Sequence, residues 1–74
     1  MPKKEKDFLI KLGERIHETR KSQDISQEVL AKRAGTTRLQ IIRIENASQP
    51  TNIITLYRIA QELSIPLSDL VDIK

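Results

Sequence analysis

The chain has 74 residues, a net charge of +3 and no cysteine, so it fits one small domain without a disulfide framework or a thiolate metal site. Its single histidine is too few for a multi-histidine metal cluster, and we expect no metal, cofactor or small-molecule ligand. The excess of Lys and Arg over Asp and Glu suits an anionic partner, and the absence of a long apolar run predicts a cytoplasmic protein that does not enter a membrane.

The N-terminal part of the chain predicts a basic arm followed by a long helix. The helix is expected from about Glu5 to Lys21, because apolar residues recur there at helical spacing. These residues are Phe8, Leu9, Leu12 and Ile16. Residues 1–7, in which lysines alternate with acidic residues, are interpreted as a flexible arm in front of a domain formed by residues 8–74. Such an arm either only solubilises the chain or touches the anionic partner.

Two short helices joined by a glycine-containing turn are the most informative feature of the sequence. The first is expected from Gln27 to Ala34, with Ser26 as its N-cap. Gly35 supplies the left-handed backbone conformation that ends this helix. The second is expected from Arg38 to about Asn46.

The second of these helices has an apolar and a polar side. Thr37 and Gln40 match a capping box at its start. Ile41 and Ile44 lie three residues apart and point to the same side. The opposite side carries Arg38, Leu39, Gln40 and Arg43. This arrangement predicts a helix-turn-helix, which offers one helix to the major groove of DNA.

These outward residues have a functional and a plain interpretation. Arginine can bond guanine and glutamine can bond adenine in bidentate fashion, but on an isolated helix such residues mostly form a solvated surface. Leu39 fits a contact with a thymine methyl group, a dimer contact or a plain exposed leucine. Gln27 begins the helix that crosses the DNA backbone in this geometry, so we expect it to contact phosphate or the edge of the site.

The remaining chain predicts two more helices. One is expected from about Asn52 to Leu63 with Thr51 as its cap, and it ends because Pro66 disfavours a helical conformation in the residue before it. Its expected core residues are Ile53, Leu56, Ile59, Ala60 and Leu63. A last short helix is expected from Leu67 to Val71. No segment alternates with a strand period, so the predicted fold class is all-α with five helices.

Three polar residues lie outside these patterns. Arg20 and Glu45 each lie at the end of a predicted helix. They either face solvent or form a partly buried pair that joins the first helix to the third. His17 lies among polar neighbours and is interpreted as an ordinary surface or boundary residue.

The segment from Ile16 to Val71 resembles the Cro/C1-type helix-turn-helix domain, the lambda-repressor-like family of phage and bacterial regulators. The residues that carry the resemblance are Arg15, Ile16, Arg20, the runs Ser26–Ala31, Ala34–Thr37 and Arg43–Asn46, Ile41, Pro50, Thr51 and Leu56 through Asp69. The resemblance covers nearly the whole chain. It implies a compact lambda-repressor-like fold with the helix-turn-helix at its second and third helices.

The resemblance also implies roles for individual residues. Arg20 and Glu45 are expected to form a structural salt bridge. The expected base contacts are Arg38, Leu39, Gln40 and Arg43, and the expected contacts with the DNA backbone or the edge of the site are Gln27, Thr37, Asn46 and Thr51. A twofold homodimer is expected to form through the loop Ala47, Ser48, Gln49 and Pro50 and through the C-terminal residues Leu67, Val71 and Ile73.

Three residues depart from the pattern of this family. Val29 replaces a common glutamate, which removes a capping box, and Ala47 stands where glycine is frequent. Both changes are expected to weaken the local structure slightly. Ile42 replaces a small polar residue and is expected to pack against a neighbour or a DNA methyl group.

The sequence therefore predicts a sequence-specific regulator of transcription that binds double-stranded DNA. We expect a stand-alone dimeric repressor or autoregulator with a pseudo-palindromic operator. The alternative is an antitoxin or another protein-binding module whose main partner is a protein, such as a toxin, with DNA binding secondary. An enzyme is not expected, because the chain has neither a cysteine nucleophile nor a glycine-rich phosphate loop.

Overall fold

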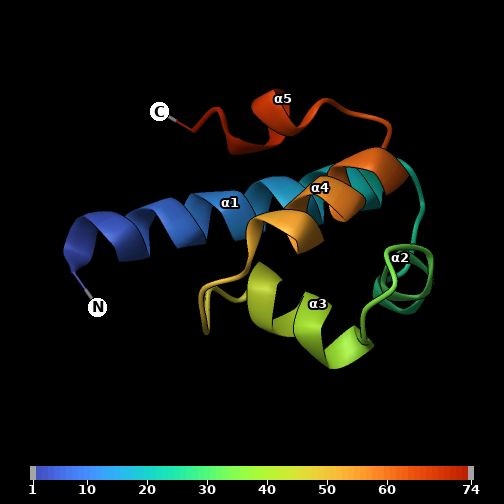
Figure 1. Cartoon of the computed structure of the whole chain (residues 1–74), viewed down its shortest axis with the longest axis horizontal. Coiled ribbons are helices and arrows are strands. Elements are labelled where there is room, and N and C mark those ends of the chain that lie inside the picture. The colour runs from blue at the N-terminus through green and yellow to red at the C-terminus, as the bar shows by residue number, and fades with distance from the viewer. Residues whose placement is uncertain (1, 74) are drawn as a thin grey trace.

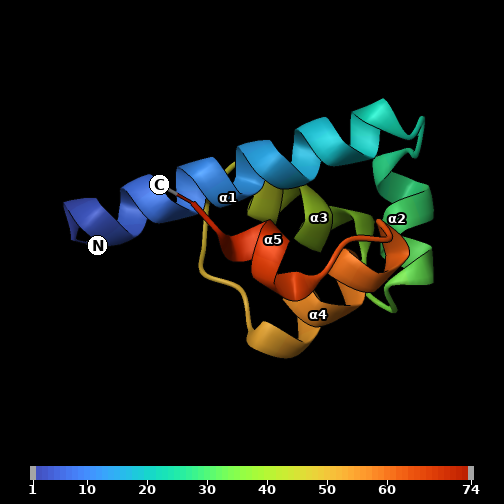
Figure 2. The same cartoon turned by 90° about the horizontal axis from the view of Figure 1, so that it is seen from above.

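The computed structural model describes residues 2–73, which form five α-helices and contain no strand (Figure 1). The helices are α1 (Lys3–Ser22), α2 (Gln27–Arg33), α3 (Arg38–Glu45), α4 (Ile53–Glu62) and α5 (Leu67–Val71). α3 and α5 pack against α1, while α2 packs against α3 and α4. Figure 2 shows the N-terminal end of α1 projecting beyond the other helices. The predicted all-α fold is confirmed. Met1 and Lys74 lie outside the described residues.

α1 begins earlier than the sequence indicates. Pro2 occupies its N-cap, and the carbonyl of this proline accepts the first backbone hydrogen bond, from Lys6. Residues 3–7, expected in a flexible arm, therefore form the first turns of the helix instead. The Lys6 ammonium group also donates a hydrogen bond to the carbonyl of Ala47, which ties this end of α1 to the loop after α3.

The core is one apolar cluster to which every helix contributes. The spacing of three or four residues between its members places them on one side of each helix. Its members are Leu12 and Ile16 of α1, Leu30 and Ala31 of α2, Ile41 and Ile44 of α3, Leu56, Ile59 and Ala60 of α4, Leu70 of α5, and Ala34 and Leu63 from the turns after α2 and α4.

Three residues expected on these apolar sides lie outside the core, namely Phe8, Leu9 and Ile53. Ile53 is 58% exposed, because α4 begins at this residue and its first turn lies at the margin of the bundle (Figure 2). The N-cap of α4 is Asn52 rather than the predicted Thr51, and the Asn52 side chain accepts a hydrogen bond from Thr55 N at 2.8 Å. Phe8, on the projecting part of α1, is also exposed.

The first four helices end in the same kind of turn. The residue after each C-cap has a φ between 55° and 68°, in the left-handed region; these residues are Asp24, Gly35, Ala47 and Ser64. In each turn the next backbone N–H bonds to the carbonyl five residues earlier, as in a Schellman motif. Only one of the four positions is glycine, so the sequence revealed only the turn at Gly35. Ala47 stands out because it has neither the freedom of glycine nor a polar side chain that could bond locally.

Gly13 sets how closely α1 and α3 approach each other. A Cβ atom at this position would lie 2.6 Å from Glu45 O and 2.7 Å from Ile44 O. Both are backbone atoms, which cannot turn aside as a flexible side chain can. Glycine therefore allows the end of α3 to lie directly against α1, and this contact brings Glu45 to the polar side chains of α1.

Candidate nucleic-acid interface

Side-chain caps fix the starts of α2 and α3. Ser26 Oγ accepts a hydrogen bond from Val29 N at 3.1 Å, and Thr37 Oγ1 accepts one from Gln40 N at 3.2 Å. Both residues were predicted as caps. The capping box expected at the start of α3 is only half formed, because the side chain of Gln40 bonds to Gln49 instead. The two helices and the turn between them thus form a helix-turn-helix with defined ends.

The four residues predicted to contact bases lie on the side of α3 away from the core. Arg38 and Leu39 are exposed, and Leu39 keeps 52% of its surface open. Gln40 and Arg43 are half-buried. None of the four belongs to the apolar core cluster. Ile42 is half-buried as well, in keeping with packing against its neighbours.

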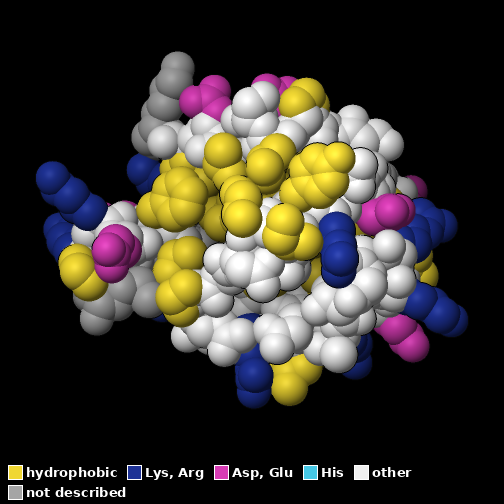
Figure 3. Space-filling model, viewed as in Figure 1, with side chains coloured by type: hydrophobic (Ala, Val, Ile, Leu, Met, Phe, Trp, Pro, Cys, Tyr) yellow, Lys and Arg dark blue, Asp and Glu magenta, His cyan; other side chains and the backbone are white. Residues whose placement is uncertain are grey.

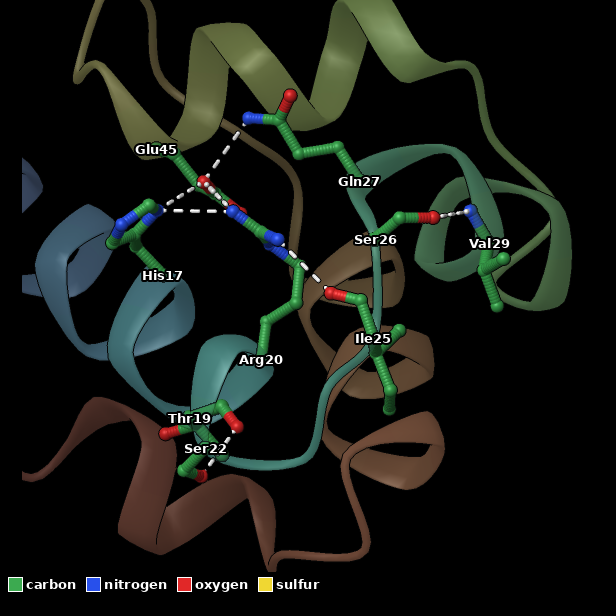
Figure 4. A network of polar contacts seen from close by, with 9 residues as sticks. All are labelled: His17, Thr19, Arg20, Ser22, Ile25, Ser26, Gln27, Val29 and Glu45. Carbon is green, nitrogen blue, oxygen red and sulfur yellow. Dashed lines mark hydrogen bonds and ion pairs between the residues drawn. The ribbon is translucent and has the colours of Figure 1, made fainter.

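A buried ion pair holds α3 against α1. Arg20 Nε donates to Glu45 Oε2 at 2.8 Å and Arg20 Nη2 donates to Glu45 Oε1 at 3.0 Å, so the pair is bidentate (Figure 4). The two side chains are only 7% and 4% exposed. Arg20 Nη1 also donates to the carbonyl of Ile25 at 2.9 Å, which fixes the chain entering α2. The pair therefore ties α1 to α3, and Arg20 also ties α1 to the chain entering α2.

Two further side chains reach the same carboxylate. His17 Nδ1 lies 2.9 Å from Glu45 Oε1, and Gln27 Nε2 donates to this oxygen at 3.2 Å. Burial raises the pKa of Glu45, but the hydrogen bonds from Arg20, His17 and Gln27 outweigh it and leave the pKa below its ordinary value. Glu45 is therefore an ionised acceptor at neutral pH. Nothing in the sequence indicates that His17 joins this network, because its partner is 28 positions away in the chain.

One hydrogen bond within the protein holds the side chain of Gln27. Its amide nitrogen is engaged by Glu45, and Figure 4 shows the amide oxygen directed away from that carboxylate. The half-buried side chain can therefore offer its oxygen and its second amide hydrogen to an outside partner. Gln27 also lines a cleft of about 700 Å³ between the end of α1 and the starts of α2 and α3, together with the basic residues Lys21 and Arg38.

The other predicted contacts with the DNA backbone flank α3. Thr37 is exposed at its start, and Asn46 is exposed at its C-cap. Thr51 is half-buried in a polar cleft of about 370 Å³ beside the start of α4, which Gln40 and Gln49 also line. Thr37 and Asn46 thus lie at the two ends of α3, and Thr51 shares a cleft with Gln40.

The predicted dimer residues lie differently from what the sequence suggested. Ala47 is 2% exposed, so it offers almost no surface to a second copy. The remaining loop residues, Ser48, Gln49 and Pro50, are exposed or half-buried. Leu67, Val71 and Ile73 are half-buried and pack against the core of their own chain. Ile73 thus has contacts within its own chain, and its place in a dimer interface stays a prediction.

An apolar patch on α4 was missed by the sequence analysis. Ile53, Ile54 and Tyr57 are 58%, 56% and 48% exposed. Figure 3 shows apolar side chains gathered on the face that α4 and α5 form. The sequence contains these apolar residues on α4. Only the structure shows that the rest of the described chain leaves them exposed.

A helix-turn-helix such as the one formed by α2 and α3 is found in a known class of DNA-binding proteins. A sequence profile of a helix-turn-helix family matches residues 16–70. The chain therefore belongs to the Cro/C1-type helix-turn-helix family, as its sequence predicted.

One solved structure in particular has a similar fold. It is the restriction–modification controller protein C.AhdI from Aeromonas hydrophila, with a TM-score of 0.82 and 29% sequence identity. The match covers 84% of this chain and 94% of that one. A search of curated proteins finds no match. None of the described helices has the length and apolar character needed to cross a membrane.

Proposed function

We propose that this protein is a sequence-specific regulator of transcription that places α3 in the major groove of double-stranded DNA. The observation that supports this proposal is a helix-turn-helix with defined ends, whose outer residues on α3 are not part of the apolar core. The Arg20–Glu45 pair and two caps fix its geometry, while Arg38, Gln40 and Arg43 present groups that can bond base edges. The family and the similarity to a controller protein support the same function.

We further infer that the protein acts as a twofold dimer on a pseudo-palindromic operator. One reading helix covers only a few base pairs, which is too little to select one site in a genome. The apolar patch of Ile53, Ile54 and Tyr57 is a suitable interface, because a twofold axis buries the same patch on both copies. This surface is added to the expected interface in place of the buried Ala47, and the loop residues Ser48–Pro50 lie next to α4. A protein acting on DNA in this way would work in the cytoplasm.

Titration of labelled DNA, first selected from a random pool, tests the main proposal. Fluorescence anisotropy should show affinity that falls linearly with salt concentration on a log–log scale, because phosphate contacts release counterions. Arg38→Ala and Arg43→Ala should each weaken binding to the selected site by about 1–3 kcal/mol. Lys11→Ala, on α1 away from the helix-turn-helix, serves as the charge-matched control. Failure to bind any selected or genomic DNA at low salt would reject the proposal.

The dimer has a separate test. Ile54→Asp and Tyr57→Asp should weaken self-association and operator binding together, since each charge enters a twofold interface twice. Ile10→Asp is the control, because Ile10 is an exposed apolar residue of α1. Analytical ultracentrifugation at micromolar protein measures the association. A wild type that stays monomeric and occupies DNA as one copy would exclude the dimer, whereas a patch that binds another protein would favour the antitoxin alternative.

A further inference from the structure

The Gln40 carboxamide is held in one orientation by a residue outside α3. Gln49, in the loop between α3 and α4, donates a hydrogen bond from Nε2 to Gln40 Oε1 at 2.9 Å. Both side chains are half-buried and both line the polar cleft beside the start of α4. Within residues 2–73, no hydrogen bond engages the side-chain amide nitrogen of Gln40, Nε2. The bond therefore holds the carbonyl oxygen toward the loop and leaves the amide hydrogens for an outside partner.

The two ends of a carboxamide recognise different groups on the bases: the oxygen accepts from a donor, and the amide hydrogens bond to an acceptor. Glutamine reads adenine by donating to N7 while its oxygen accepts from the N6 amine, so this contact needs both ends. Cytosine presents a donor, its N4 amine, and also needs the oxygen. Guanine N7 and O6 and thymine O4 are acceptors, which need only the amide hydrogens. The oxygen of Gln40 keeps a second lone pair, but its bond to Gln49 directs it toward the loop, so Gln40 matches guanine or thymine better than adenine or cytosine.

We propose that Gln49 is a positioning residue that sets the base preference of Gln40. Through this bond Gln40 selects guanine or thymine over adenine and cytosine at one position of each half-site. The inference rests on the proposed function, because it requires α3 to lie in the major groove. Gln49 acts through Gln40 and needs no contact with a base itself, so a loop residue helps to determine what the recognition helix reads.

Selection of bound sites from a random DNA pool, with the wild type and three variants, tests this inference. Gln40→Ala identifies the base position that Gln40 reads, as the position whose preference is lost. Gln49→Glu replaces the donor with a carboxylate, which only accepts, so it draws the Gln40 nitrogen toward the loop and turns the oxygen outward. The preference at that position should then shift toward adenine or cytosine by about fivefold or more.

Gln49→Met is the matched control for Gln49→Glu. Methionine has a similar length but no strong hydrogen-bonding group, so the Gln40 carboxamide should turn freely and the preference should flatten without reversing. Preferences are compared between bases for each protein separately. The negative charge of Gln49→Glu, which lowers affinity for every DNA site, therefore does not affect the comparison. Far-UV circular dichroism checks that each variant keeps its helices.

The outcomes separate this inference from the proposed function. If Gln49→Glu and Gln49→Met both keep the wild-type preference at the position identified, Gln49 does not orient Gln40 and the inference is wrong. It is also wrong if Gln40→Ala loses no base preference while the protein still selects specific sites. In both cases the protein remains a DNA-binding regulator. If the wild type selects no site at all, the proposed function fails and the inference fails with it.

Discussion

Removal of the arginine from the buried Arg20–Glu45 pair should destabilise the fold far more than removal of a surface arginine from the same helix. The pair is bidentate, and its side chains are only 7% and 4% exposed. Arg20→Met keeps most of the apolar stem but deletes the guanidinium group. It leaves the Glu45 carboxylate buried, with His17 and Gln27 as its remaining partners.

The structure indicates the size of this loss. Loss of one partner from a buried ion pair typically costs about 3–5 kcal/mol, because the other charge stays buried without compensation. Arg20→Met also removes the hydrogen bond to the carbonyl of Ile25. His17 and Gln27 still contact the Glu45 carboxylate, which reduces the loss of stability. We therefore expect a loss of about 3 kcal/mol. Arg15→Met is the matched control on α1: Arg15 is exposed and donates to the carbonyl of Asp69, so its loss should be at most about 1 kcal/mol.

Urea unfolding followed by circular dichroism measures these losses. A double-mutant cycle with Arg20→Met, Glu45→Gln and the double variant isolates the coupling between the two side chains. The double variant should lose about 2 kcal/mol less than the sum of the single losses, in the range found for residues in direct contact. The reasoning is refuted if the losses are additive within about 0.5 kcal/mol and Arg20→Met is no more harmful than Arg15→Met.

Three further predictions concern stability. Gly13→Ala should cost at least about 2 kcal/mol in urea unfolding, because the new Cβ would meet the backbone oxygens of Ile44 and Glu45; a loss below about 0.5 kcal/mol would contradict the close approach of α1 and α3. Ala47→Gly should raise the melting temperature and add roughly 0.5–1 kcal/mol, because Ala47 has a φ of 56°; an unchanged or lower stability would argue against strain there. The pKa of Glu45 is lowered in the folded state, so its contribution is fully present above the ordinary value of 4.5 and is lost as the pH falls through the folded pKa. Urea unfolding between pH 3 and 7 should show this loss in the wild type and a smaller one in Glu45→Gln.

The fold could be predicted in large part because its signals are local. Ser26 and Thr37 are good N-caps, and Gly35 allows the left-handed turn between α2 and α3. The spacing of Ile41 and Ile44 identified the side of α3 that faces the core, and hence its outer side. Each of these signals depends on residues a few positions apart, so one sequence was enough to find them.

The features that the sequence did not reveal depend on contacts between distant segments. Gly13 is an ordinary helix residue in the sequence, and only the crossing of α1 and α3 explains it. Ile53 has the right spacing for the core, but it lies on a first turn that no other helix covers. Ile73 looked free at the end of the chain, yet it packs against the core.

The same limit applies to the chemistry of the site, where residue type does not determine which group faces outward. Gln27 and Gln40 both bear a carboxamide, which can donate or accept. Glu45 accepts from the nitrogen of Gln27, whereas Gln49 donates to the oxygen of Gln40. The first glutamine therefore keeps its oxygen free and the second keeps its amide hydrogens free. Under the proposed function, a change at Glu45 or Gln49 would therefore alter which groups Gln27 and Gln40 present to DNA, although neither glutamine itself is changed.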